Sequence, residues 1–84
     1  MNPGMFTVTA PLTGTFYRAP SPEEPPFVEK DRKVAAGDVV CIIESMKVFT
    51  ELRTDAGGIV RNILVEDEQL VARNQGLIEI EVVN

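Results

Sequence analysis

The sequence predicts an all-β domain, a small antiparallel barrel or sandwich, and two observations carry this prediction. Short runs rich in Val, Ile, Thr and Phe alternate with Gly, Pro, Asn and Asp breaks, as expected of many short strands joined by turns. In addition, VAAGDVVCIIE at 34–44 aligns with VARNQGLIEIE at 71–81, and the tripeptide at 14–16 aligns with that at 58–60. We therefore expect two similar halves built from strands.

Six segments are expected to form strands, because each is short and rich in residues that suit a pleated, half-buried backbone. The last of them alternates apolar and acidic residues, with Ile78 and Ile80 on one face and Glu79 and Glu81 on the other. In chain order the expected strands are 6–10, 14–18, 39–44, 48–53, 58–65 and 77–83.

The segment 39–53 needs a decision, because it contains no Gly, Pro, Asn or Asp and exceeds the usual strand length of about 5–6 residues. Apolar residues at 39, 42, 43, 46 and 49 also match a helical stripe. Many of its residues are β-branched, which restricts their side chains in a helix, so we favour two strands joined by a turn near 45–47. The usual hairpin-turn residues are missing there, and a broken local rule of this kind tends to mark a functional position.

The first half contains about seven extra residues relative to the second, and the segment APSPEEPP at 19–26 is the obvious insertion. Its four prolines fix φ and remove backbone donors, so it cannot be a paired strand. Composition favours a stiff surface loop, and a rigid projection with a function is the sharper alternative.

Composition limits the function. The chain has 84 residues, enough for one small domain, and a formal net charge of −5, which argues against binding to nucleic acid or to anionic membranes. Histidine is absent, and no nucleophile-plus-base pair is recognisable, so no catalytic residue and no metal site is predicted. The single Cys41 lies in an apolar run and is expected in the core. Without a secretory signal or a possible internal disulfide, the expected compartment is the cytoplasm.

These features resemble the biotinyl domain of biotin carboxyl carrier proteins, in the biotin/lipoyl attachment family. ESMKV at 44–48 resembles the Glu-Ala-Met-Lys-Met motif of that family. PLTGTFYRAPSP at 11–22 resembles its first two strands and the start of its "thumb", VAAGDVVCIIESMK at 34–47 its approach to the hairpin, and GGIVRNILVEDEQLV at 57–71 its second half. The likeness covers about residues 9–81.

The resemblance implies a flattened barrel or sandwich of two antiparallel four-stranded sheets with quasi-twofold symmetry. Its halves would span about 7–44 and 48–83, with the lysine at a hairpin tip and the thumb inserted in the first half. Residues 1–6 would be an N-terminal extension, and residues 7–84 the biotinyl domain. Full-length carriers have a longer N-terminal segment and a linker, so the chain is expected to be either an excised domain or a short subunit.

The resemblance also implies the site. Biotin would be the cofactor, joined by an amide bond to Lys47. The residues around it would be read by biotin protein ligase: Glu44, Ser45, Met46 and Val48. The thumb would consist of Ala19, Pro20, Ser21, Pro22, Glu23, Glu24, Pro25 and Pro26, and it would partly shield the biotin.

The implied function is that of a biotin carboxyl carrier, a non-catalytic part of a biotin-dependent carboxylase. In that family, biotin carboxylase uses ATP and bicarbonate to carboxylate biotin, and carboxyltransferase passes the carboxyl group to an acyl-CoA. A thumb is characteristic of acetyl-CoA carboxylase, which makes malonyl-CoA for fatty acid biosynthesis. The alternatives are a carrier for another acyl-CoA such as propionyl-CoA, a lipoyl domain, and an unmodified interaction module.

Three residues depart from the family pattern. Ser45 replaces the usual Ala, and Val48 replaces the usual Met or Leu, both of which bear on the efficiency of the ligase. Ala19 stands where well-studied members of the family have Thr, so any hydrogen bond from that hydroxyl is not available here.

Overall fold

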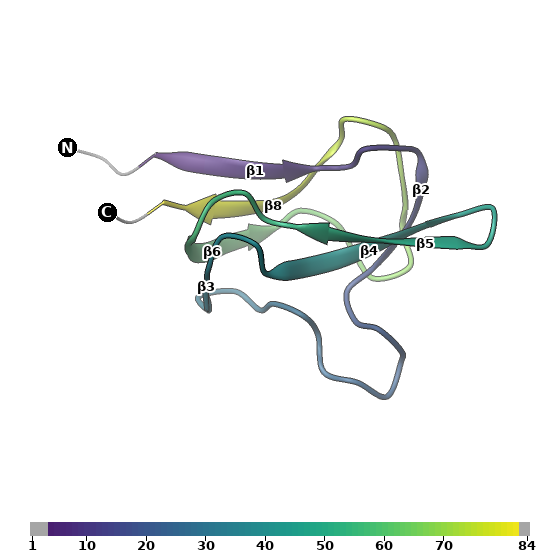
Figure 1. Cartoon of the computed structure of the whole chain (residues 1–84), viewed down its shortest axis with the longest axis horizontal. Helices are drawn as coiled ribbons and strands as arrows, with labels where there is room; N and C mark the ends of the chain where they lie inside the picture. Colours follow the sequence, from purple (N-terminus) through teal and green to yellow (C-terminus); the bar gives the residue numbers. More distant parts are fainter. Residues whose placement is uncertain (1–3, 83–84) are drawn as a thin grey trace.

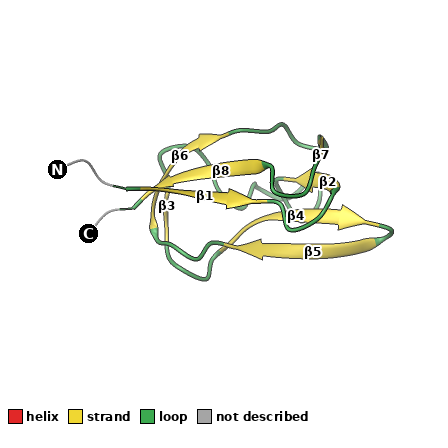
Figure 2. Ribbon diagram, turned by 90° about the horizontal axis from the view of Figure 1, so that it is seen from above, coloured by secondary structure: helices red, strands yellow, loops and turns green. Residues whose placement is uncertain are grey.

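The structure, a computed structural model, describes residues 4–82, and all regular secondary structure in that part of the chain is β (Figure 1). The eight strands are β1 (Met5–Thr9), β2 (Gly14–Tyr17), β3 (Lys33–Val34), β4 (Val39–Ser45), β5 (Val48–Arg53), β6 (Gly58–Ile63), β7 (Leu70–Val71) and β8 (Gly76–Glu81). They form two four-stranded sheets. Figure 2 shows the strands from a second direction, with the β4–β5 hairpin extending beyond the other strands at one end.

The two sheets have equivalent topologies. One has the strand order β1-β8-β6-β3 and the other β5-β4-β2-β7, and every pairing is antiparallel. Exchanging each of β1 to β4 with the strand four places later converts one order into the other. The predicted pair of four-stranded sheets with quasi-twofold symmetry is therefore confirmed.

The six predicted strands are all present, with small differences at their ends. The interval 48–53 was predicted without error, and the helical interpretation of 39–53 is wrong, because this segment forms the β4–β5 hairpin. Two short strands, β3 and β7, were not predicted. The first strand begins at Met5, two residues before the predicted start of the domain, and position 83 of the last predicted strand lies outside the described residues.

The hydrophobic core fills the space between the two sheets. Each sheet contributes its inward-facing residues, such as Phe16 and Ile43 from one and Val60 and Ile80 from the other, all at most 1% exposed. Cys41 also lies in this core, as predicted, and its side chain is fully buried. Burial raises the pKa of its thiol to about 12, so this cysteine is not a nucleophile in the folded domain.

The turns before β4 and β8 occupy equivalent places in the internal repeat and are closed by the same type of hydrogen bond. The amide of Ala35 donates to Asp38 Oδ2 at 2.8 Å, and at the equivalent place the amide of Ala72 donates to Gln75 Oε1 at 2.9 Å. The residue before each acceptor has a positive φ, 94° at Gly37 and 72° at Asn74. Different residue types thus build the same turn in both halves.

The barrel is elongated, with extents of 43 × 27 × 20 Å. The β4–β5 hairpin projects at one end of the long axis, and the start of β1 and the end of β8 lie at the other end (Figure 1). The loop between β2 and β3 leaves the body of the barrel at one side.

Candidate functional site

The β4–β5 hairpin ends in a two-residue turn formed by Met46 and Lys47. Ser45 and Val48 are the last paired residues of the two strands. Both turn residues have positive φ values, 52° for Met46 and 67° for Lys47, as in a type I′ turn. This geometry matches the right-handed twist of the strands, and it places Lys47 at the extreme tip of a rigid arm.

A local hydrogen bond supports this turn. The backbone amide of Lys47 donates to Glu44 Oε2 at 3.0 Å. Asn or Gly would favour the positive φ of such a turn, whereas Met and Lys do not. The hydrogen bond from the Lys47 amide to the Glu44 carboxylate therefore favours this turn over other backbone conformations of Lys47, in which the bond would be lost.

Large apolar side chains surround the lysine on the surface. Met46 is 92% exposed, and Val48 and Phe49 are 63% and 64% exposed. The Lys47 side chain is also exposed, and within residues 4–82 it forms no ion pair. The tip therefore presents an accessible primary amine flanked by unburied apolar groups, an arrangement suited to recognition and acylation by an enzyme.

The insertion 19–26 forms an irregular loop that is closed at its base. The amide of Phe27 donates to the carbonyl of Arg18 at 2.9 Å, so the loop leaves and rejoins the sheet at adjacent points. Arg18 is anchored by Asp67, whose Oδ1 accepts its amide at 3.0 Å and whose Oδ2 lies 3.7 Å from its guanidinium Nε. A turn inside the loop is closed by the bond from the Glu24 amide to the Ser21 carbonyl.

A cleft of about 320 Å³ lies between this loop and the outer face of β2, β4 and β5. Tyr17, Ile42 and Phe49 line its sheet side, and the rings of Tyr17 and Phe49 are 6.2 Å apart at an angle of 44°. Ala19, Pro20, Ser21, Pro22 and Glu24 line it from the loop. Phe49 is only two residues beyond Lys47 along β5, so the cleft opens close to the hairpin tip.

The structure thus gathers most of the predicted site residues in one region. Glu44, Ser45, Met46, Lys47 and Val48 share the hairpin end. Five of the eight thumb residues line the cleft, and Glu23, Pro25 and Pro26 do not. Sequence reasoning missed Tyr17, Ile42 and Phe49. An aromatic residue two positions after the predicted attachment lysine was the available signal for Phe49.

Two further properties concern the described residues as a whole. Residues 4–82 contain no group of three or more acidic, histidine or cysteine side chains placed to hold a metal ion. That part of the chain also has no helix with the length and apolar character needed to cross a membrane.

The structure is a small β-barrel of two equivalent sheets with a lysine at the tip of a projecting hairpin, and comparison identifies its family. Residues 6–80 match the family model described as biotin-requiring enzyme, and the chain belongs to this family. The predicted resemblance to the biotin/lipoyl attachment family is confirmed.

Curated relatives share this assignment. The chain is 45% identical over 74 residues to the biotin carboxyl carrier protein of acetyl-CoA carboxylase from Haemophilus influenzae, covering 88% of this chain and 48% of the relative. It is 46% identical over 74 residues to the protein of that name from Nostoc, covering 88% of this chain and 41% of the relative. The chain thus spans about half, or less, of the length of these relatives.

Solved structures show the same fold. A single-chain, multi-domain long-chain acyl-CoA carboxylase aligns with a TM-score of 0.80 at 20% identity, over 100% of this chain and 8% of that one. The Kluyveromyces lactis urea carboxylase aligns with a TM-score of 0.74 at 25% identity, over 92% of this chain and 6% of that one. In both cases the domain corresponds to a small part of a large carboxylase.

Proposed function

We propose that this chain is a biotin carboxyl carrier domain, with biotin attached through an amide bond to Lys47. The observation that carries the proposal is the geometry of the hairpin tip, which exposes one lysine amine on a rigid two-residue turn. The relatives named as biotin carboxyl carrier proteins of acetyl-CoA carboxylase support it. The other two lysines, Lys30 and Lys33, precede or begin the short edge strand β3 and do not occupy a hairpin tip.

The hairpin residues fit the attachment of such a group. An exposed amine without an ion pair among the described residues can be reached by an acylating enzyme. We assign Glu44, Ser45, Met46 and Val48 to recognition by biotin protein ligase, because they surround the lysine on both strands. The apolar side chains of Met46 and Val48 would gain burial against the ligase that they lack in the free domain.

When attached to Lys47, biotin would supply the carrier chemistry, which is the reversible binding of a carboxyl group. The domain contributes position: a tethered group reaches both active sites at a high effective concentration. We propose biotin carboxylase and carboxyltransferase as the partners that provide those sites, and acetyl-CoA as the acceptor, as the names of the relatives suggest. A cytoplasmic location remains a prediction.

We propose that the thumb, residues 19–26, partly shields the biotin group. The cleft offers an apolar surface for a flat ring or an alkyl chain. Tyr17, Ile42 and Phe49 form this surface on the sheet side, and prolines form it on the loop side. Ala19 lines the cleft without a hydroxyl, so backbone groups and packing would provide this shielding.

The proposal is tested by intact-mass analysis after incubation with biotin ligase, biotin and ATP. We expect one biotinyl group on the wild type, one on Lys30→Arg and Lys33→Arg, and none on Lys47→Arg, which keeps the charge and loses the acceptable amine. Streptavidin binding by Lys47→Arg would contradict the assignment. Modification by lipoate ligase in place of biotin ligase would show that the domain carries lipoate.

A further inference from the structure

The turn at Met46-Lys47 adopts a backbone conformation that its residues do not favour. Two successive non-glycine residues have φ values of 52° and 67°. Side chains with a Cβ meet the following carbonyl oxygen in this region, so such residues need support from their surroundings. Met46 is almost fully exposed and provides no packing that would hold the turn.

The support comes from Glu44. Its Oε2 accepts the Lys47 amide at 3.0 Å, and a hydrogen bond to an ionised acceptor is stronger than one between neutral groups. Within residues 4–82 no lysine or arginine forms an ion pair with Glu44, so the carboxylate is not drawn away from the turn.

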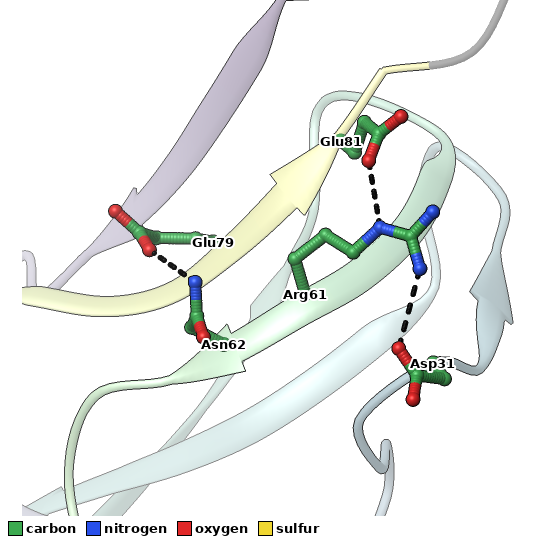
Figure 3. Close-up of polar contacts among 5 residues, drawn as sticks. All are labelled: Asp31, Arg61, Asn62, Glu79 and Glu81. Carbon is green, nitrogen blue, oxygen red and sulfur yellow. Dashed lines mark hydrogen bonds and ion pairs between the residues drawn. The ribbon is translucent and has the colours of Figure 1, made fainter.

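The symmetry-related position shows that this arrangement is particular to the hairpin end. In the repeat, Glu44 corresponds to Glu81, and Tyr17 corresponds to Arg61. Arg61 donates from Nε to Glu81 Oε1 at 2.7 Å and from Nη1 to Asp31 Oδ1 at 3.2 Å (Figure 3). The hydrogen bond to Glu81 raises the pKa of Arg61, so the guanidinium keeps its charge.

The neighbouring pair on the same face is also satisfied across strands. Asn62 donates to Glu79 at 2.8 Å, beside the Arg61–Glu81 pair on β6 and β8 (Figure 3). On the face that carries Glu44, an aromatic ring replaces the arginine, and Tyr17 packs near Phe49. Glu81 is therefore held by Arg61 in the second half. Glu44, its equivalent in the first half, has no such arginine and accepts the amide of Lys47 instead.

We propose that Glu44 is a positioning residue, whose carboxylate holds the Met46-Lys47 turn in the left-handed conformation and so presents the lysine to the ligase in one geometry. This inference rests on the proposed function for its kinetic consequence, and the conformational part stands on the turn alone. The contribution of Glu44 to recognition by the ligase would then act through the conformation of the turn. The alternative is that the ligase contacts the charged carboxylate directly.

Two substitutions separate these roles. Glu44→Gln removes the charge and keeps an oxygen that can accept the Lys47 amide, whereas Glu44→Ala removes the acceptor. Glu51→Ala is the matched control, because Glu51 is a second carboxylate on the outer face of the same hairpin, paired across from Ile42 and bonded to Arg53. Thermal unfolding confirms that each variant is folded before the comparison.

The first measurement is NMR of the unmodified domain. We expect faster solvent exchange of the Lys47 amide in Glu44→Ala, together with φ-dependent couplings of Met46 and Lys47 that move away from left-handed values. Glu44→Gln and Glu51→Ala should resemble the wild type. An unchanged Lys47 amide in Glu44→Ala would overturn the proposal, whatever the ligase does.

The second measurement is the steady-state rate of biotinylation. If only the left-handed turn is a substrate, Glu44→Ala should raise the apparent KM by roughly 3- to 10-fold, the effect of losing one hydrogen bond, with little change in kcat. Glu44→Gln should stay within about twofold of the wild type.

The remaining outcomes are decisive as well. An equal loss in Glu44→Gln and Glu44→Ala would show that the ligase reads the charge, and unchanged kinetics in a Glu44→Ala domain with a loosened turn would refute the presentation role. If wild-type Lys47 accepts no biotin, the proposed function fails, and the NMR result still decides the role of Glu44 in the turn.

Discussion

Gly14 begins β2 at a point where two strands approach too closely for a side chain. A Cβ added there would lie 2.5 Å from the carbonyl oxygen of Glu44 and 2.8 Å from Cγ2 of Ile43. Gly58 occupies the equivalent place in the second half, and its Cβ would meet the carbonyl oxygen of Glu81. We therefore expect Gly14→Ala to destabilise the domain close to the turn of the β4–β5 hairpin.

The size of the effect follows from these contacts. Both atoms belong to β4, which is paired with β2 on one side and β5 on the other, so relief requires a shift of paired backbone. Overpacking of this kind costs about 1–3 kcal/mol, and the reduced freedom of the unfolded chain offsets at most about 1 kcal/mol. A net loss of about 1–2 kcal/mol lowers the melting temperature of a domain this size by about 4–16 °C.

Thermal unfolding followed by circular dichroism measures this directly, and Gly37→Asn is the control. Gly37 has nothing within 4 Å of an added Cβ and a φ of 94°, and Asn74 holds the equivalent turn position with a φ of 72°. We expect Gly37→Asn to shift the melting temperature by less than about 4 °C. If Gly14→Ala shifts it no more than this control, the argument from close strand approach is incorrect.

Three further predictions concern other parts of the domain. Met46→Asp should change the melting temperature by less than about 4 °C, because the side chain is 92% exposed, while biotinylation falls sharply; a large loss of stability would show that Met46 contributes packing. Replacing residues 19–26 by a short Gly-Ser turn should leave folding and biotinylation of Lys47 nearly intact. The ends of the loop are already adjacent, because the amide of Phe27 donates to the carbonyl of Arg18 at 2.9 Å. The replacement should slow carboxyl transfer in the assembled carboxylase or increase the NMR-detected mobility of biotin, and no change in either would make the loop passive. Burial raises the pKa of Cys41 to about 12 from a value of 9.0, so the folded state retains the proton longer, and stability falls as pH rises from about 9 to 12. Urea unfolding should therefore show a loss of about 2 kcal/mol between pH 8 and 10.5 that is absent from Cys41→Ala.

The fold was predictable because its strands obey simple patterns. The alternation of Ile78, Glu79 and Ile80 and the Gly-rich breaks define strands regardless of their partners. The strands β3 and β7 were missed because each pairs only two residues, too few for any pattern. Their exposed members, Lys33 and Leu70, have side chains that loops tolerate equally well.

The site was predictable only in part. The turn position followed from the repeat, but positive φ values at Met46 and Lys47 run against the preferences of both residues. They depend on a carboxylate three positions earlier, a contact that exists only once the hairpin has formed. The cleft is less accessible still to sequence reasoning, because Tyr17, Ile42 and Phe49 meet through the register of three strands.

The duplicated fold provides a physical means of separating function from stability. Equivalent positions in the two halves have equivalent structural duties, as the paired glycines at 14 and 58 and the matched turns at 35–38 and 72–75 show. Where equivalent positions carry different residues, the shared fold does not explain the difference, and a functional reason is the alternative. Such differences gather on one side of the hairpin end: the inserted loop 19–26, and a tyrosine in place of the arginine that neutralises Glu81. At the corresponding end of the other sheet, Met5 of β1 pairs with Glu81 of β8, two strands that are not consecutive and so are not joined by a hairpin turn. The strands that the two halves share therefore serve the stability of the fold. The residues that differ between the halves, loop 19–26 and Tyr17, are the better candidates for a role in function.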